Sequence, residues 1–315
     1  MTTRRNFLKN TTMLAAGLGV SPLLSSSPLR SYQKEEVING KVRIAVIGVG
    51  MGCRDLQGAL TDNPWVHCVG MCDVNKVRLE EQLARFKKDF PEQTVSIKAY
   101  TDFREVLANK EIDGVIIATP DHWHPYIFAE ALKAGKAIYV EKPVGNSISE
   151  CNAMMDFQKK YKGVVTTGLW QTSQRYFRAA NEILKSGVLG DVYKVQLWLC
   201  QSTNPRPSVE DSEAPSTLDY DMWLGPAPER PFNNSRFRGW RGFWDYGGGQ
   251  QTDWGVHWID SAFDGLKALG LCDREYPDAV FSIAYKDPAS FNETPSCQTS
   301  MFQYKNFHIE WAQQV

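Results

Sequence analysis

The sequence lacks the marks of several protein classes. Its formal net charge is only −1 over 315 residues, and no block of like charge is present. This balance gives no electrostatic basis for binding nucleic acid or an anionic membrane. The seven cysteines are odd in number, scattered, and without CxxC spacing. Their pattern argues against a zinc site or a disulfide framework and indicates buried free thiols, including Cys68 and Cys72 in one strand-like run.

A membrane-spanning run is also lacking. The apolar stretch at residues 13–24 is too short and too weakly apolar for a span. It follows the paired arginines Arg4 and Arg5 and precedes a serine-rich exit, which is typical of a signal for the twin-arginine route. No cysteine precedes Cys53, so no lipid anchor is expected. Residues 1–39 are therefore interpreted as an export signal and linker, which predicts a periplasmic protein.

A buried strand is predicted at Val42 to Ile47, where β-branched and apolar residues run without interruption. It ends in a glycine-rich turn that contains Gly48, Gly50 and Gly52. Glycines permit a tight turn and a close approach of the backbone to a pyrophosphate at a helix N-terminus. By itself this turn is weak evidence for dinucleotide binding.

A second strand, Val66 to Met71, is followed by Asp73. A carboxylate at that strand end would accept hydrogen bonds from the adenosine ribose hydroxyls and repel a 2′-phosphate. The pattern favours NAD, while Lys76 nearby leaves NADP open. The structural alternative for Asp73 is a helix N-cap.

Strands and helices then alternate, which predicts an α/β protein with a parallel sheet and right-handed crossovers. Ligands bind at the carboxyl ends of such strands, where Thr119 to His124 and Glu141-Lys142-Pro143 fall. The elements expected here are helices at 79–88, 103–108 and up to 134, and strands at 95–100, 115–118, 137–140 and 164–167.

Three segments resemble one known family. ATPDHWHP at 118–125, VEKPVG at 140–145 and GGGQQTDWGVHWID at 247–260 are similar to the Gfo/Idh/MocA family of glucose–fructose oxidoreductases and inositol dehydrogenases. With the glycine turn, they occur in the order of the family. The resemblance implies a Rossmann domain at 40–172 and an α/β domain at 173–315. The open, mostly antiparallel sheet of the second domain would form one wall of the active site.

Three residues are candidates for catalysis. Lys142 lies at a strand end, with Pro143 fixing the backbone that follows. Asp253 and His257 are spaced i, i+4, so on one helix they share a face and the carboxylate can orient the imidazole. A solvated lysine and a core histidine are the ordinary alternatives. The resemblance favours catalytic roles for all three residues.

Further site residues follow from the matching segments. His122 and His124 are not expected to bind a metal, because their loop spacing does not put them on one face. Pro120 and Trp123 are expected to line the nicotinamide pocket, and Glu141 to lie near the nicotinamide ribose or the lysine. The predicted cofactor-binding residues are Gly48, Gly50, Gly52, Asp73, Thr119, Pro120, His124, Glu141 and Lys142. The predicted substrate-binding residues are Trp123, Trp170, Gln171, Arg241 and Trp254.

The second half carries most of the ten tryptophans. A helix at 174–185 and strands at 192–200, 279–285, 296–304 and 307–312 are expected. Residues 201–241 form a long irregular segment, which in a compact enzyme is commonly functional. At 236–249 arginines alternate with aromatic residues, a pattern that suits either single-stranded nucleic acid or a sugar. The net charge favours the sugar, and a purely structural role stays open.

The sequence thus predicts an exported NAD(P)-dependent oxidoreductase acting on a hydroxyl-bearing carbon of a sugar, cyclitol or glycoside, with a tightly held cofactor. One alternative is a glycosidase that works by oxidation, elimination and reduction; another is a non-catalytic carbohydrate-binding protein. A homo-oligomer formed through the C-terminal sheet is expected, without nucleic acid or a membrane anchor. Exported members of the family generally continue beyond the strand pattern that ends near Val315, so a fragment or a shortened form is expected.

Overall fold

The computed structural model describes residues 41–50, 63, 65–91, 97–200, 207–273 and 276–314. The predicted signal at 1–39 and Gly52 lie outside the described residues. Contacts divide the chain into two units, each described by itself below. Unit 1 takes in the residues up to Val140 with 148–166 and 213–230. Unit 2 takes in 141–147, 167–212 and the residues from 231 onward.

Unit 1 contains a six-stranded sheet with the order β3-β2-β1-β4-β5-β6. The strands from β3 to β5 in this order run parallel to their neighbours, for example with Ala45 of β1 opposite Val115 of β4. This is the strand order of a Rossmann fold, and it confirms the predicted α/β class. The strands are β1 (Val42–Ile47), β2 (Val66–Cys72), β3 (Lys98–Tyr100), β4 (Gly114–Ile117), β5 (Ala137–Val140) and β6 (Val165–Thr167).

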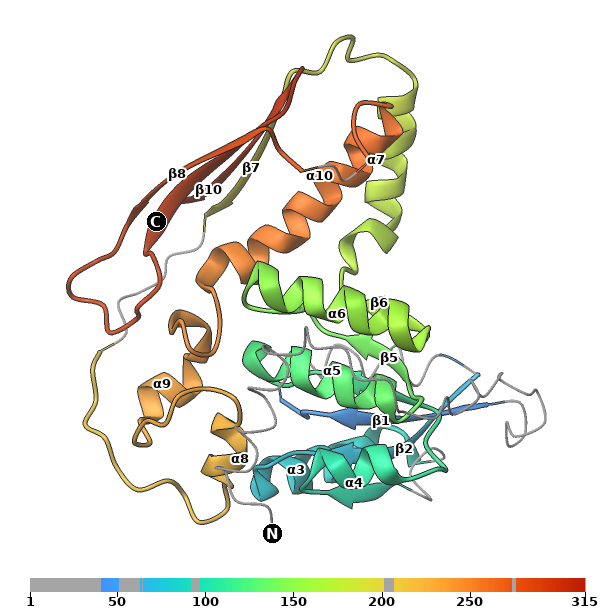
Figure 1. The fold of residues 1–315 in the computed structure, drawn as a ribbon, viewed down its shortest axis with the longest axis vertical. Helices are drawn as coiled ribbons and strands as arrows, with labels where there is room; N and C mark the ends of the chain where they lie inside the picture. Colours follow the sequence, from blue (N-terminus) through green and yellow to red (C-terminus); the bar gives the residue numbers. More distant parts are fainter. Residues whose placement is uncertain are drawn as a thin grey trace, which may run out of the picture. The chain divides into compact units, whose positions relative to one another are not determined.

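Helices connect these strands and cover the sheet (Figure 1). Leu79 and Phe86 of α3 pack with Val46, Met71 and Ile116 in a core that is almost fully buried. The side chain of Asn75 caps α3, which therefore begins at Lys76. The predicted helix at 79–88 began three residues too late. The helices of unit 1 are α3 (Lys76–Asp89), α4 (Phe103–Ala108), the 3₁₀ turn η3 (Asp121–Trp123), α5 (His124–Lys133), α6 (Ile148–Tyr161) and α8 (Tyr220–Leu224).

Unit 2 contains a four-stranded sheet with the order β7-β10-β9-β8. β10 is parallel to β7 and antiparallel to β9, which is antiparallel to β8. The expected mostly antiparallel second sheet is therefore confirmed. The strands are β7 (Lys194–Cys200), β8 (Ala279–Tyr285), β9 (Cys297–Gln303) and β10 (His308–Gln314).

One face of this second sheet packs on helix α10, where Leu266 joins Tyr304, Phe307 and Ile309 in a buried core (Figure 1). α10 also packs on α7, to which it is tied by a hydrogen bond from the amide of Asn181 to Asp264. The helical elements are η4 (Gln171–Ser173), α7 (Arg175–Lys185), α9 (Asn234–Arg238), η5 (Trp240–Gly242), the π-helical turn η6 (Gln251–Gly255) and α10 (Val256–Ala268).

The described cysteines are free, and Cys68, Cys72 and Cys272 are buried, whereas Cys200 is exposed, so the prediction of buried thiols is wrong for Cys200. Burial raises the pKa of the Cys68 thiol to about 12, and burial, followed by the charge of Asp73, raises the pKa of Cys72 as well. Both thiols are therefore unreactive packing groups, as predicted. Within the described ranges, no helix is long and apolar enough to cross a bilayer.

Candidate functional site

The glycine turn of unit 1 is held by its backbone. Gly48 follows β1 with φ of +88°, a left-handed conformation that favours glycine. Its N–H donates to the carbonyl of Cys72 at 2.8 Å. A Cβ at this position would lie 2.6 Å from the carbonyl carbon of Ala118, so a side chain cannot be accommodated. At Gly50, by contrast, the nearest atom to an added Cβ is 3.9 Å away, which leaves the backbone approachable.

Asp73 follows β2 and is buried beside this turn. Its carboxylate accepts hydrogen bonds from the N–H groups of Val49 at 3.1 Å and Asn75 at 2.8 Å. Burial raises its pKa, while the charge of Arg78 acts in the opposite direction. The N-cap of α3 is Asn75, whose side chain accepts from the N–H of Arg78, so the N-cap alternative for Asp73 is wrong.

Arg78 is a residue that the sequence-based prediction missed. Its guanidinium lies 3.9 Å from where a Cβ on Gly50 would be, and its charge acts on Asp73. Lys76, which was considered for a 2′-phosphate, is the first residue of α3 and donates its backbone N–H to Thr217. The position of Arg78 in the first turn of the helix after Asp73 could have indicated that its side chain lies near this carboxylate.

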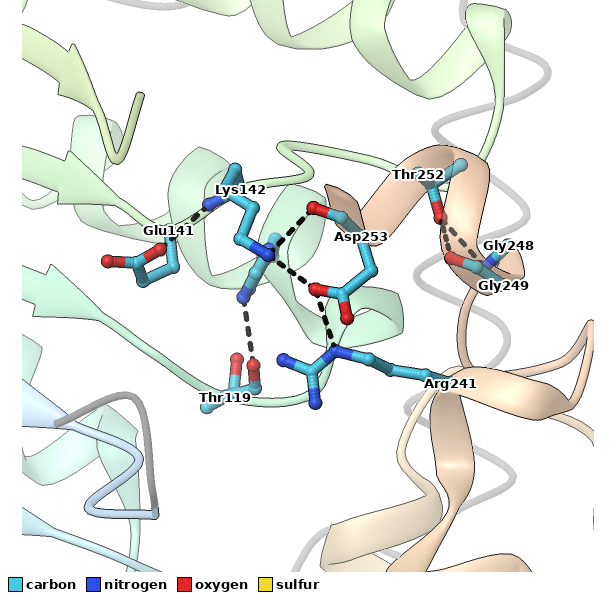
Figure 2. Close-up of polar contacts among 9 residues, drawn as sticks. Thr119, Glu141, Lys142, Arg241, Gly248, Gly249, Thr252 and Asp253 are labelled. Carbon is cyan, nitrogen blue, oxygen red and sulfur yellow. Dashed lines mark hydrogen bonds and ion pairs between the residues drawn. The ribbon is translucent and has the colours of Figure 1, made fainter. Parts of the chain in front are cut away.

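The loop after β4 carries Thr119, Pro120 and His124. His124 is buried, and its Nε2 lies 2.9 Å from the carbonyl oxygen of Thr119, a contact that fixes the loop (Figure 2). Pro120 precedes η3 and is half-buried. The hydroxyl of Thr119 is buried without a partner among the described residues. A hydroxyl without a partner, at a strand end beside the glycine turn of Gly48, fits a dinucleotide. The ribose and phosphate groups of a dinucleotide need such hydrogen-bond partners.

Trp123 is not placed as predicted. It is buried, its ring packs against Gly225, and its Nε1–H donates to the carbonyl of Trp223 at 3.0 Å. The ring also makes an edge contact with Phe103. The expected contact with the nicotinamide or the substrate is therefore wrong, because a packed ring has no free face to offer.

The carbonyl of Trp223 also lies 3.0 Å from Nε2 of His122. Because that carbonyl is an acceptor, the contact assigns the proton of a neutral His122 to Nε2. Within the described part of the chain, no group of three or more His, Cys, Asp or Glu side chains could hold a metal ion.

Residues 213–230, which we call the return segment, explain this packing. They follow the first strand of the second half, yet they make their contacts within unit 1. Thr217 accepts from Lys76, and Asp219 donates its N–H to the carbonyl of Val74 at 3.0 Å. The long irregular segment predicted at 201–241 thus includes a piece that covers the chain just after Asp73.

In unit 2, a lysine and an arginine meet on one carboxylate (Figure 2). Lys142 Nζ donates to both Oδ1 and the backbone carbonyl of Asp253, the latter at 2.8 Å. Nε of Arg241 lies 3.2 Å from the same Oδ1. The ammonium also lies 6.0 Å from the ring centroid of Trp254. The ammonium predicted to be held rigidly after β5 is thus fixed by Asp253 from a distant part of the chain.

His257 lies in the first turn of α10 and is buried. Its ring is 5.7 Å from that of Trp170 and 5.9 Å from that of Trp254. Burial, and then the charge of Lys142, lowers its pKa to about 4, while Asp253 acts in the opposite direction. The imidazole is therefore neutral at physiological pH and able to accept a proton.

The expected hydrogen bond from Asp253 to His257 is wrong. Asp253 lies in the π-helical turn η6 rather than in the α-helix of His257, and its carboxylate contacts Lys142 and Arg241 instead. Nδ1 of His257 is buried without a partner among the described residues. The i, i+4 argument assumed one regular helix, whereas π-helical turns are frequent at functional sites.

Three other predicted residues lie near this cluster. Glu141 accepts a hydrogen bond from the N–H of Lys142 at 3.2 Å and packs against Gly168. Gln171 is buried and accepts from the hydroxyl of Ser261 at 3.1 Å, so it ties η4 to α10, and its predicted contact with a substrate stays a prediction. Trp170 is 45% exposed and keeps a free surface next to His257.

These features define a two-domain protein built on a Rossmann nucleotide fold, with a charged cluster in its second unit. Residues 42–169 match the family described as "Oxidoreductase family, NAD-binding Rossmann fold", of the Gfo/Idh/MocA group. Residues 178–267 match the C-terminal alpha/beta domain of the same oxidoreductase family. The two matches together take in more than half of the chain, which therefore belongs to the Gfo/Idh/MocA family and carries its NAD-binding domain.

Relatives have several names. An alpha-N-acetylgalactosaminidase of Tannerella forsythia is 33% identical over 163 residues, which cover 47% of this chain and 34% of that protein. An inositol 2-dehydrogenase of Salmonella typhimurium is 24% identical over 151 residues, covering 47% and 43%. The chain spans less than half the length of these relatives.

Solved structures share the fold. The WlbA dehydrogenase of Bordetella pertussis, solved with NADH and UDP-GlcNAcA, superimposes with a TM-score of 0.63 at 16% identity. The superposition covers 86% of this chain and 71% of that one.

Proposed function

We propose that the protein is an NAD-dependent oxidoreductase that removes a hydride from a hydroxyl-bearing carbon of a sugar, cyclitol or glycoside. The observation that carries this proposal is the arrangement of Lys142 on Asp253 with the neutral His257 in the same unit. A hydroxyl can be oxidised only if its proton is taken up as the carbon gives up its hydride. The cluster offers a base and a cation for that step.

In the proposed mechanism, His257 accepts the hydroxyl proton and Lys142 stabilises the alkoxide that develops. Asp253 is a positioning residue, because it holds the ammonium through its carboxylate and its carbonyl. Trp170, exposed next to His257, offers an apolar face for a sugar ring.

The cofactor side of the proposal rests on unit 1. Gly48 and Gly50 would admit the pyrophosphate, Asp73 would accept from the ribose hydroxyls, and the hydroxyl of Thr119 would meet a polar group of the cofactor. NAD, when bound, supplies the acceptor of the hydride. The cation Arg78 beside Asp73 keeps NADP within the proposal, since a guanidinium is a good partner for a 2′-phosphate.

A second candidate is a glycosidase that uses the same cofactor internally. The 33% identical relative named alpha-N-acetylgalactosaminidase supports it. Oxidation of a ring hydroxyl to a ketone would acidify the neighbouring C–H; loss of that proton would expel the aglycone. Water would then add to the enone, and the ketone would be reduced by the hydride taken in the first step. The same base and cation serve both reactions.

One experiment separates the two. The purified protein is denatured to identify any released dinucleotide, and the native protein is screened with free sugars, cyclitols and aryl glycosides. Net NADH formation supports the dehydrogenase. Aglycone release without net NADH supports the glycosidase, and sugar binding without either product contradicts both.

We also propose that the protein is exported in folded form to the periplasm, on the basis of Arg4 and Arg5 before the apolar stretch at 13–24. Such a route suits a protein that must acquire its dinucleotide in the cytoplasm. Replacing both arginines with lysine should leave the protein in the cytoplasmic fraction. Unchanged export of this variant would contradict the proposal.

We propose in addition that two copies associate through the outer face of the second sheet. The register places Trp198 on the face that carries Phe281 and Ile283, and all three side chains are more than half exposed. Large exposed apolar side chains of this kind favour burial against a partner. Light scattering of Phe281→Lys should report a loss of the oligomer, with Val188→Lys as an exposed control outside the sheet.

A further inference from the structure

Arg241 is held in one orientation. It lies in η5, with its guanidinium carbon 4.2 Å from the ring centroid of its neighbour Trp240. Its Nε is 3.2 Å from Oδ1 of Asp253. Stacking restricts the plane of the guanidinium, and the ion pair draws Nε toward Asp253. The side chain is nevertheless 42% exposed, so it is fixed without being covered.

The cluster around Arg241 carries an excess of positive charge. Two cations, Arg241 and Lys142, contact the same oxygen of the single carboxylate of Asp253. His257 adds no charge near neutral pH, since burial and Lys142 keep its pKa at about 4. Lys142, Arg241 and Asp253 together therefore carry a net charge of +1.

The carboxylate next to Lys142 in the sequence, that of Glu141, is directed away from the ammonium. It accepts from the backbone N–H of Lys142 at 3.2 Å, and it lies so close to Gly168 that a Cβ there would be 2.6 Å from its Oε2. In Figure 2 this carboxylate points away from the ammonium of Lys142. Oε2 of Glu141 is therefore engaged by the backbone N–H of Lys142.

The terminal nitrogens of Arg241 point away from Asp253 (Figure 2). Among the described residues, Asp253 is the anion that pairs with this guanidinium, and it engages Nε. The two terminal N–H groups thus present a planar fork. Such a fork matches the two oxygens of a carboxylate, which it binds bidentately.

Resting on the proposed function, we propose that Arg241 selects a substrate that carries a carboxylate close to the hydroxyl that Lys142 and His257 address. The substrate class is a sugar acid or a carboxylated cyclitol. The carboxylate binds to the fork of Arg241 and is unchanged in the reaction, while the neighbouring hydroxyl is oxidised. Its one negative charge compensates the one positive charge of the cluster.

The charge also separates a carboxylate from a phosphate. A phosphate monoester carries about −1.5 to −2 at neutral pH, which exceeds the charge of the cluster. A sulfate ester has the right charge but tetrahedral oxygens. Both are therefore included in the test as competitors.

The test uses the full chain loaded with NAD and matched pairs of hexoses and hexuronates of the gluco, galacto and manno series. Each pair differs only at C6, and the corresponding 6-phosphates and 6-sulfates complete each set. We expect kcat/KM for at least one hexuronate to exceed that of its hexose by roughly 10- to 100-fold, the range for a hydrogen bond to a charged group. Arg241→Met should reduce this ratio to near one.

Two further variants keep the test decisive. Arg241→Lys keeps the charge without the fork, and should retain only part of the preference if the geometry matters. Arg238→Met removes the same charge from an exposed position three residues away, and should leave the ratio unchanged. Circular dichroism and NAD binding establish that each variant is folded.

The failure of this inference differs from that of the proposed function. If a hexose is turned over as efficiently as its hexuronate, the role of Arg241 is overturned while the oxidoreductase proposal stands. A preference for the phosphate or sulfate ester has the same consequence. If no compound is turned over, calorimetry decides. Hexuronate binding that depends on Arg241 then supports the inference without the reaction, and equal or absent binding of all sets overturns it.

Discussion

The glycine turn of unit 1 and the charged cluster of unit 2 are built by different means. Around Gly48 and Asp73 the contacts are made by the backbone: a left-handed φ, a carbonyl behind the glycine, and two N–H groups on the carboxylate. Around Lys142 the contacts are made by side chains of opposite charge that come from distant positions.

The difference teaches what each region can tolerate. A backbone cradle is sensitive to any added side chain, because the nearest atoms cannot move away. A cluster of charges tolerates small changes in shape but not the loss of one member, since the remaining charges then change their balance. The following substitutions test this contrast, from the largest expected effect to the smallest.

Replacing Lys142 with alanine should have the largest effect. We expect kcat to fall by about 1000-fold or more, because both the stabilising cation and a proton partner are lost. Asp253 keeps Arg241 as a partner, so the fold should survive. Steady-state kinetics and NAD binding measure the two effects. Lys185→Ala, at an exposed ion pair on α7, is the control, and full activity of Lys142→Ala would refute the site assignment.

Replacing Gly48 with alanine should weaken NAD binding by at least about 10-fold. The strained φ alone costs on the order of 1–3 kcal/mol, and the Cβ would press on the backbone of Ala118. The matched control is Gly135→Ala, where φ is +70° but no atom lies within 4 Å of the added Cβ. That variant should lose some stability and keep its NAD affinity. Equal NAD affinities of the two variants would show that the close approach is unimportant.

The pH dependence should reveal His257. Its folded pKa of about 4 lies below the ordinary value of 6.5, so the unfolded chain binds more protons between these two values. The free energy of unfolding should therefore fall as pH drops from about 6.5 to 4. Above pH 6.5 the imidazole is neutral in both states, so His257 should add no pH dependence there. Urea titrations across this range measure the slope. His257→Gln should show a shallower slope, and an unchanged slope would contradict the buried, neutral imidazole.

Replacing Trp123 with phenylalanine should have the smallest effect. The ring volume is largely kept, but the N–H that donates to Trp223 is lost, which costs about 1 kcal/mol. Urea unfolding measures the loss. Trp198→Phe, at an exposed indole, should stay within about 0.5 kcal/mol of the parent protein. If Trp123→Phe also lost less than about 0.5 kcal/mol of unfolding free energy, the hydrogen bond from Trp123 to Trp223 would not anchor the return segment.

Much of the fold could be predicted from local patterns. The strands at 42–47, 137–140 and 279–285 agree with the structure to the residue, because runs of β-branched and apolar residues bounded by turn residues carry their own signal. Gly48 could be predicted for the same reason, since the need for a left-handed turn is local.

The side-chain partners could not be predicted in this way. Asp253 was expected to serve His257, four residues away, and instead serves Lys142, which is 111 residues away. Trp123 was expected in a binding pocket and instead anchors the return segment through Trp223. The first expectation rested on a short spacing and the second on a resemblance. In both cases the observed partner comes from a part of the chain that only folding brings near.

The sequence by itself therefore determined the alternation of elements, the glycine turn, the carboxylate after β2 and the placement of Lys142 just after β5. Each of these depends on backbone preferences and on periodicity, which act over a few residues. The tertiary structure decided that Lys142 and Arg241 share Asp253, that Arg78 stands beside Asp73, and that residues 213–230 return to unit 1. These depend on which distant segments pack together, because charge pairing and burial act through space rather than along the chain.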